Sequence, residues 1–247
     1  MSNSEPLQVG VLSLARPTFD VPFAEQVCAN AWNLLEKIPI NWIGSRELLF
    51  DAESVESQIA KLKKKPIDLL LIMQLTFTDA TMTVKLAESF DVPLFFWSFP
   101  EKRTGGRLRL NSLCGINLAA HALGKSGIQC DYINFSPNDP ETLETISSWI
   151  RAFQTRKNLS QTKIAVIGKH PDGFHTCAFD SEKLNDISGV KVEQMELKDL
   201  FDEAERIEQN TVNLVRNELD SKIDGIELVE QEPLEKSIRI LSALRKK

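Results

Sequence analysis

The chain has 247 residues, of which 42% are hydrophobic and 26% are charged, and its formal net charge is −6. Such a composition is typical of a globular protein with room for one large domain or two modest ones, and the acidic balance argues against a nucleic-acid-binding surface. The sequence contains no apolar run of membrane-spanning length, no signal peptide, and four widely spaced cysteines without a CxxC pair. We therefore expect a cytoplasmic protein with reduced thiols that binds neither nucleic acid nor membrane.

Two stretches of the chain share one organisation, in which a short apolar run leads into a polar loop. Residues 7–20 read LQVGVLSLARPTFD, and residues 162–180 read TKIAVIGKHPDGFHTCAFD. Apolar runs rich in β-branched residues are typical of strands that are covered on both faces of a parallel sheet. Because ligands bind at the carboxyl ends of such strands, we expect both loops to open an α/β domain and to face substrate.

The predicted elements after the first strand alternate between helices and strands. Asp20 stands where an N-cap is expected, and apolar residues at helical spacing then predict a helix that ends at Pro39. Four further strands, each followed by a helical pattern, are predicted at residues 40–43, 68–73, 93–98 and 129–135. This alternation predicts an α/β fold, with a doubly wound parallel sheet in the flavodoxin-like order 2-1-3-4-5.

A polar stretch separates this pattern from a second one. Residues 156–162 read RKNLSQT, and we place the domain boundary between residues 157 and 158. In the second domain, 158–247, strands are predicted at residues 162–167 and 190–196, with a possible third strand at 224–229. Helices are predicted at 181–187, from about 197 onwards, and at 234–244. Two or three strands are few for an independent α/β domain, so we expect this second domain to be incomplete.

Polar side chains collect where the strands of the first domain end. The switch point of a flavodoxin-like sheet lies between its first and third strands, which brings Arg16 and Asp20 near Gln74. The loop after the fourth strand follows Trp97 and contains several cations and Asn111. Cations and hydrogen-bonding groups beside an indole suit a polyhydroxylated or anionic small molecule. Surface loops are polar in any case, so a plain solvated edge is the alternative interpretation.

Other motifs give little indication of chemistry. No GxxxxGK[ST] is present, and no GxGxxG opens a helix after a strand, so nucleotide-binding motifs are absent from the sequence. His170 and His175 share a loop with Cys177, but their spacing matches no usual zinc pattern. The carboxylates at 196–208 fall on a predicted helix, where a solvated face explains them better than an acid–base pair. The residues by themselves therefore assign no catalytic or metal-binding group.

Three stretches of the sequence are familiar in combination. They are ARPTFD at 15–20, the run from FFWSFP to TGGRLRLNSLCGINLAAHAL within 95–123, and GKHPDGFHTCAFD at 168–180. In this order and at this separation, they resemble the N-terminal region of the L-fucose isomerase and L-arabinose isomerase family, and in particular its fucose-isomerase-like branch. The similarity extends from about Leu7 to Phe201.

The resemblance implies a subunit of two α/β domains followed by a C-terminal catalytic domain that this chain lacks. Family members interconvert aldoses and ketoses through a metal-bound enediol, with Mn²⁺ held by two acidic residues and a histidine. In the family these ligands lie late in the second domain and in the third. We therefore expect the chain to be a fragment, or naturally short, with no bound metal and no activity of its own.

The resemblance also implies a homo-oligomer in which the N-terminal domain reaches into a neighbouring subunit's sugar pocket. Arg16 matches the arginine of the family's Arg-Pro-Thr segment and is expected to hydrogen-bond sugar hydroxyls. Trp97 matches the aromatic residue at the end of the fourth strand and is expected to stack on the sugar ring. Gln74, Asn111 and His170 are further candidates for sugar contact, although the loop of His170 would also serve to pack between domains.

Two functions of other classes are compatible with the same sequence. One is a stand-alone, two-lobed sugar-binding or regulatory protein, which would bind sugar without metal. The other is a scaffold whose loops only mediate oligomerisation, which would form a stable oligomer without binding sugar.

Overall fold

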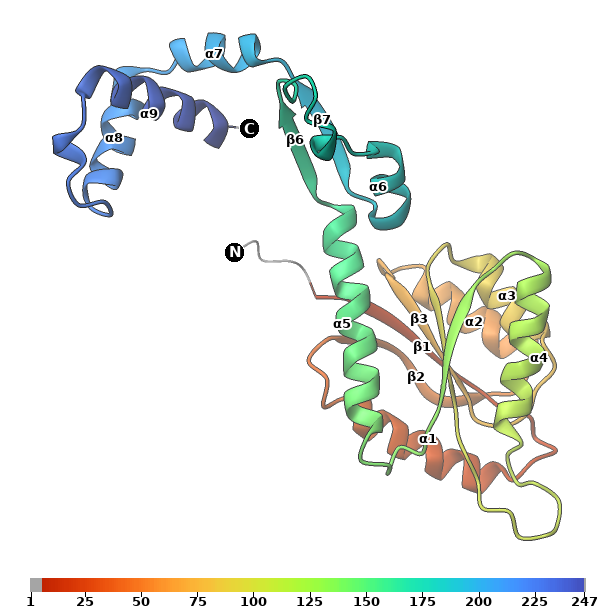
Figure 1. The fold of residues 1–247 in the computed structure, drawn as a ribbon. Coiled ribbons are helices and arrows are strands. Elements are labelled where there is room, and N and C mark those ends of the chain that lie inside the picture. Colours follow the sequence, from red (N-terminus) through yellow and green to blue (C-terminus); the bar gives the residue numbers. More distant parts are fainter. Residues whose placement is uncertain (1–5, 247) are drawn as a thin grey trace. The chain divides into compact units, whose positions relative to one another are not determined.

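The computed structural model describes residues 6–246 and separates them into two compact units, one ending at Gln154 and the other beginning at Thr155 (Figure 1). The first unit contains a five-stranded parallel sheet in the order β2-β1-β3-β4-β5. This confirms the predicted doubly wound α/β fold. The strands are β1 (Gln8–Leu14), β2 (Asn41–Leu49), β3 (Leu69–Gln74), β4 (Leu94–Ser98) and β5 (Cys130–Asn134).

Helices cover both faces of this sheet (Figure 1). On one face lie α1 (Val21–Leu35) and α5 (Thr142–Ser160). On the other lie α2 (Ala52–Leu62), α3 (Thr81–Ser89) and α4 (Ser112–Lys125). Successive residues of the central strands alternate between the two cores, so that Leu71 packs on the first face and Ile72 on the second. Strand β3 is continuously apolar in sequence because both of its faces are buried.

Local sequence signals set the starts of two helices. The Asp20 carboxylate accepts a hydrogen bond from Phe23 N at 3.1 Å and caps α1. Asp51 and Ser54 form a capping box at the start of α2. Strand β2 extends well past the predicted 40–43, because it is an edge strand whose polar segment GSRE breaks the apolar pattern without ending the pairing with β1.

The second unit contains one pair of parallel strands and several helices. Its elements are β6 (Lys163–Ile167), α6 (Ser181–Ser188), β7 (Lys191–Met195), α7 (Leu197–Glu205), α8 (Gln209–Asp220) and α9 (Gln231–Arg245), with 3-10 turns at His175–Cys177 and Ile226–Leu228. A small apolar core joins α7, α8 and α9. None of the helices within residues 6–246 is both long and apolar enough to cross a membrane.

Two sequence-based expectations for this part of the chain are wrong. The segment at 224–229 contains a 3-10 turn at Ile226–Leu228 instead of a strand, and Gly225 precedes the turn with φ 80°. The charged helix expected from Leu197 is two helices, α7 and α8. Helix α5 also runs through most of the polar stretch at 156–162, as far as Ser160, and the two compact units divide between Gln154 and Thr155. The polarity of a segment does not by itself determine whether its backbone forms a strand, a helix or a turn.

Glu218 ties α8 to α9 and gives this unit a pH-dependent contact. Its carboxylate accepts hydrogen bonds from Arg245 Nη1 at 2.6 Å and Lys222 Nζ at 2.7 Å, and these lower its pKa from 4.5 to about 2. A depressed carboxyl pKa adds stability above the unfolded-state pKa, and that stability is lost as pH falls toward the folded-state value. Glu218→Gln should therefore lower the melting temperature at pH 7, and the difference from wild type should shrink as the pH falls from 4.5 toward 2. Glu227→Gln, at an exposed carboxylate, is the matched control; equal effects of both variants would contradict this role.

Candidate functional site

The loops that follow β1, β3 and β4 meet at the carboxyl edge of the five-stranded sheet. Phe77 N, in the loop after β3, donates to Leu110 O at 2.8 Å, and Asp20 N, in the loop after β1, donates to Arg109 O at 3.1 Å. Residues 109–110, which precede α4, therefore join all three loops. This is the edge at which ligands bind in doubly wound α/β proteins.

Arg16 lies at the switch point between β1 and β3, as the sequence predicts. Its backbone N–H donates to Thr76 Oγ1 at 2.7 Å, which fixes its main chain on the loop after β3. Its side chain is exposed and makes no hydrogen bond or ion pair with other residues in 6–246. The pKa of the Asp79 carboxyl is lowered by hydrogen bonds from Thr81, with a smaller contribution from the positive charge of Arg16. Arg16 thus presents a guanidinium that is still available to a ligand.

Gln74 lies beneath this edge instead of on it. The side chain is fully buried, and Nε2 donates to Thr76 O at 2.7 Å and to Thr78 Oγ1 at 2.9 Å. A Cβ at Gly115 would lie 3.0 Å from Gln74, so helix α4 packs closely over the amide. Gln74 Oε1 is buried and has no partner among the residues described. Gln74 therefore shapes the loop after β3, and the direct sugar contact predicted for it is not possible in this conformation.

The predicted stacking of a sugar ring on Trp97 is also wrong for this fold. The Trp97 side chain is 0% exposed and belongs to the core between the sheet and helices α1 and α5. Its Nε1 donates to Phe135 O at 2.9 Å, and its ring centroid is 4.9 Å from that of Phe99. No face of the indole is left for a ligand. The sequence pattern around Trp97 does not distinguish these cases. An aromatic residue at the end of a fully buried strand can line either the core or a pocket.

Asn111 contributes through its backbone. It adopts a left-handed conformation, with φ 52° and ψ 35°, and is the only residue other than glycine between 6 and 246 that does so. Its N–H donates to Glu101 Oε1 at 2.7 Å, and its half-buried side chain makes no capping hydrogen bond to α4. Asn111 therefore redirects the loop into α4.

Two arginines in the loop after β4, Arg107 and Arg109, are already engaged. Arg109 Nε donates to Asp20 Oδ2 at 2.8 Å, and the guanidinium carbon lies 3.8 Å from the centroid of Phe23. The hydrogen bond from Arg109 is the largest cause of the lowered pKa of Asp20. Arg107 Nη2 donates to Thr18 O at 3.0 Å. Both arginines hold the loop after β4 against the loop after β1, which leaves Arg16 as a freer cation.

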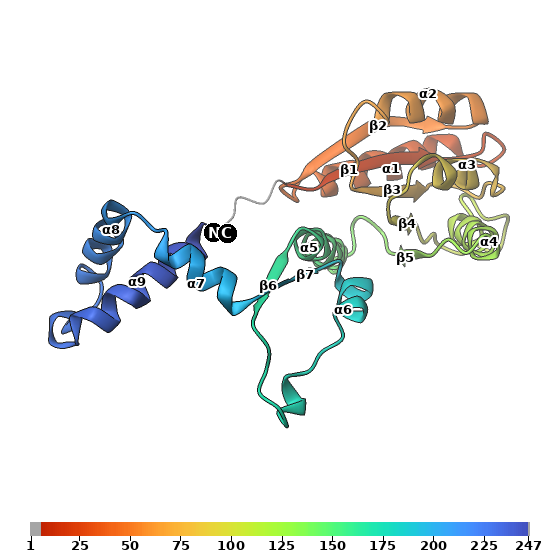
Figure 2. The ribbon, with the colours of Figure 1, turned by 90° about the horizontal axis from the view of Figure 1, so that it is seen from above.

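His170, the remaining candidate, belongs to the second unit. It lies in the loop between β6 and α6, which extends away from the strand pair (Figure 2). The ring is exposed, and its Nδ1 lies 3.0 Å from Pro171 O. Phe174 and Phe179 in the same loop are also exposed. The structure therefore places His170 at a surface without assigning it a ligand.

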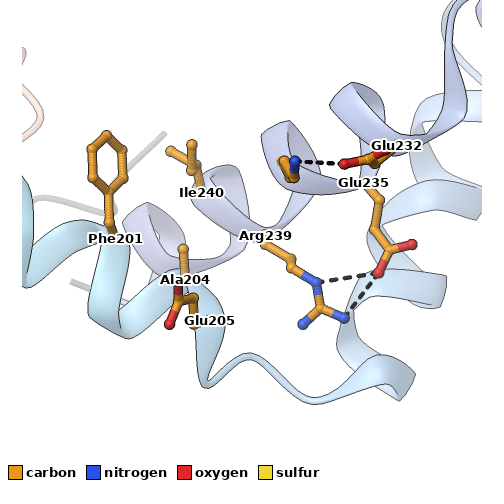
Figure 3. A pocket seen from close by; sticks show the side chains of 8 residues that line it. Phe201, Ala204, Glu205, Glu232, Glu235, Arg239 and Ile240 are labelled. Atoms are coloured by element: carbon orange, nitrogen blue, oxygen red, sulfur yellow. Dashed lines mark hydrogen bonds and ion pairs between the residues drawn. The ribbon is translucent and has the colours of Figure 1, made fainter.

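Two hollows lie away from the carboxyl edge. One, of about 560 Å³, lies between α7 and α9 (Figure 3); along α9 it is bordered by the ion pairs Lys236–Glu232 and Arg239–Glu235, so most of its charges already have partners. The other, of about 600 Å³, includes Ile40 and Asn41 at the amino end of β2. Neither hollow brings the candidate residues together.

The described residues do not fit the Mn²⁺ site that the resemblance implies. Across 6–246, no group of three or more His, Cys, Asp or Glu side chains is arranged to hold a metal ion. The four cysteines are free. No step of a metal-dependent reaction is therefore assigned to these residues.

The parallel sheet and its joined loops define the class, a doubly wound α/β domain, in which ligands generally bind at the carboxyl ends of the strands. More particularly, the family model described as "Fucose/sulfoquinovose isomerase, N-terminal domain" matches residues 10–167, so the chain belongs to the fucose/sulfoquinovose isomerase family.

The chain is similar in sequence to several proteins named sulfoquinovose isomerase. A sulfoquinovose isomerase of Priestia aryabhattai is 29% identical over 230 residues, covering 88% of this chain and 51% of the relative. Another of Alkalicoccus urumqiensis is 29% identical over 201 residues, covering 81% and 45%, and one of Clostridium sp. (strain MSTE9) is 27% identical over 223 residues, covering 89% and 49%. The chain thus spans about half the length of the curated relatives it matches.

Proposed function

We propose that this chain is the substrate-contacting N-terminal portion of an aldose–ketose isomerase in carbohydrate metabolism. The family match over residues 10–167 and the sulfoquinovose isomerases among its relatives support this function. The proposal includes a cytoplasmic homo-oligomer and, for the complete enzyme, Mn²⁺ held outside the described residues. When bound, such a metal polarises sugar oxygens. The role proposed for the present residues is to bind and orient the sugar.

The observation that carries this role is the position of Arg16. A guanidinium at the switch point, anchored through its backbone and without side-chain partners in the described chain, suits a sugar with vicinal hydroxyls or an anionic group. Sulfoquinovose, named in the relatives, offers both hydroxyls and a sulfonate. We therefore propose a sugar of this type as the ligand of the carboxyl edge.

Substitution of Arg16 tests the proposal. Titrating sulfoquinovose into the ¹⁵N-labelled chain should shift the amide signals of Arg16 and Thr76. Arg16→Ala should weaken the affinity roughly tenfold or more, because a charge-assisted hydrogen bond to the ligand is lost. Arg46→Ala, at an arginine on edge strand β2 paired with Glu36, should leave the affinity unchanged. Equal affinities of wild type and Arg16→Ala would reject the role of Arg16.

A turnover assay tests whether these residues bind the sugar without catalysing its isomerisation. The chain incubated with Mn²⁺ and sulfoquinovose, fucose or arabinose should show no isomerisation by NMR. Measurable turnover would contradict the assignment of proton transfer to groups outside the described residues. Tight sugar binding without metal, together with no contribution to any isomerase, would instead indicate a stand-alone sugar-binding protein.

A further inference from the structure

Glu101 occupies a concave site made by the backbone of its own loop. Three successive N–H groups point at its carboxylate: Arg109 N at 2.5 Å, Leu110 N at 3.0 Å and Asn111 N at 2.7 Å. Successive backbone N–H groups form such an anion-binding concavity where the chain turns through a left-handed residue, here Asn111. The half-buried carboxylate of Glu101 satisfies all three donors, of which Leu110 N belongs to a buried residue and Arg109 N to an exposed one.

Two of the three residues held by Glu101, Arg109 and Leu110, are also those that join the loops. Leu110 O receives the hydrogen bond from Phe77 N, and Arg109 O receives the one from Asp20 N. Arg109 Nε binds the Asp20 carboxylate as well. One carboxylate thus orders the segment through which the loops after β1 and β3 are tied together. Between Glu101 and Arg109 the chain has no helix or strand, so its conformation depends on such contacts.

We propose that Glu101 is a positioning residue that sets the geometry of the carboxyl edge and thereby the affinity of Arg16 for its ligand. The ligand part of this inference rests on the proposed function. Glu101 holds Arg109, and Arg109 in turn binds Asp20. Asp20 ends the loop that follows β1, and Arg16 lies near the start of that loop. It does not itself contact the ligand.

The chemistry of the side chain predicts a graded response. A carboxylate offers two charged oxygens to three donors, whereas a glutamine offers one neutral oxygen of the same reach. Alanine offers none and leaves the donors without a partner. The order of effects should therefore be Glu101→Ala larger than Glu101→Gln, with Glu101→Gln retaining part of the wild-type behaviour.

Hydrogen exchange and sugar titration on the full chain test the inference together. Glu101→Ala should speed exchange of the Leu110 and Phe77 amides by about tenfold or more, while amides of β3 exchange as in wild type. It should also weaken the affinity of the folded protein for sulfoquinovose by about tenfold, and Glu101→Gln should restore part of both effects. The control is Glu88→Ala, which removes an exposed carboxylate from α3.

The two readouts separate this inference from the proposed function. Unchanged exchange at Leu110 and Phe77 in Glu101→Ala would overturn it, as would faster exchange with full sugar affinity. If the wild-type chain bound no sulfoquinovose, the proposed function and the ligand part of the inference would both fail. Exchange would then still decide whether Glu101 holds the three loops together.

Discussion

Gly44→Ala is expected to destabilise the first unit strongly, through a clash with the backbone of a neighbouring strand. A Cβ at Gly44 would lie 2.1 Å from Val11 O and 3.0 Å from Val11 C, and these are backbone atoms that cannot rotate away. Gly44 pairs with Val11 in the β1–β2 ladder, immediately before the pairing register shifts. Relieving the contact means separating β2 from β1, at a cost on the order of 3 kcal/mol, near the upper end for overpacking.

Urea unfolding monitored by circular dichroism measures this cost. Gly124→Ala is a control with the same chemical change, since an added Cβ there meets no atom within 4 Å and the residue lies inside helix α4. It should raise stability by up to about 1 kcal/mol, because alanine is the better helix former. The two substitutions should therefore have opposite signs. A Gly44→Ala variant as stable as wild type would show that the β1–β2 ladder is looser than the structure indicates.

Trp97→Ala is the second large effect, and it distinguishes a core residue from a ligand platform. The full burial of the indole predicts a loss of about 3–5 kcal/mol on truncation. Trp97→Phe keeps an aromatic ring but removes the hydrogen bond to Phe135 O, and it should cost considerably less. Because Trp97 faces the core, the folded fraction of Trp97→Phe should bind sulfoquinovose as wild type does.

Calorimetric titration of Trp97→Phe checks this assignment. A pronounced loss of sugar affinity at near wild-type stability would show that the indole contacts the ligand and would restore the stacking role. A loss of stability with unchanged affinity would support the buried role. Trp149→Phe is a suitable comparison, since this half-buried indole stacks on Phe95 at 3.5 Å between centroids, on the same face of the sheet.

The fold of the first unit was predictable because its signals are local and repeated. The apolar run of β3 and the capping position of Asp20 each determine an element without reference to the rest of the chain. The chirality and length of the connections then limit the possible sheet orders, and the flavodoxin-like order is a common one among them. Such reasoning fails in the second unit, where Ile226, Leu228 and Val229 suggest a strand but the segment pairs with none of the described strands.

The candidate site was predictable only in outline. Topology places Arg16 beside the loop after β3, and the structure confirms that proximity through Thr76. Topology does not indicate which way a side chain at a strand end points, so Gln74 and Trp97 look like ligand contacts in the sequence although both are buried. Glu101 was missed because its partners are backbone N–H groups eight to ten residues away, and a backbone partner leaves no mark in the sequence.

The main chain around Arg16 is held from both sides, by Ala15 N donating to Leu49 O at 3.0 Å and by Arg16 N donating to Thr76 Oγ1 at 2.7 Å. Association with a sugar would therefore restrict only the rotamers of one guanidinium arm, while the peptide units that carry it are ordered beforehand. The part of the entropic penalty that falls on this backbone is correspondingly small.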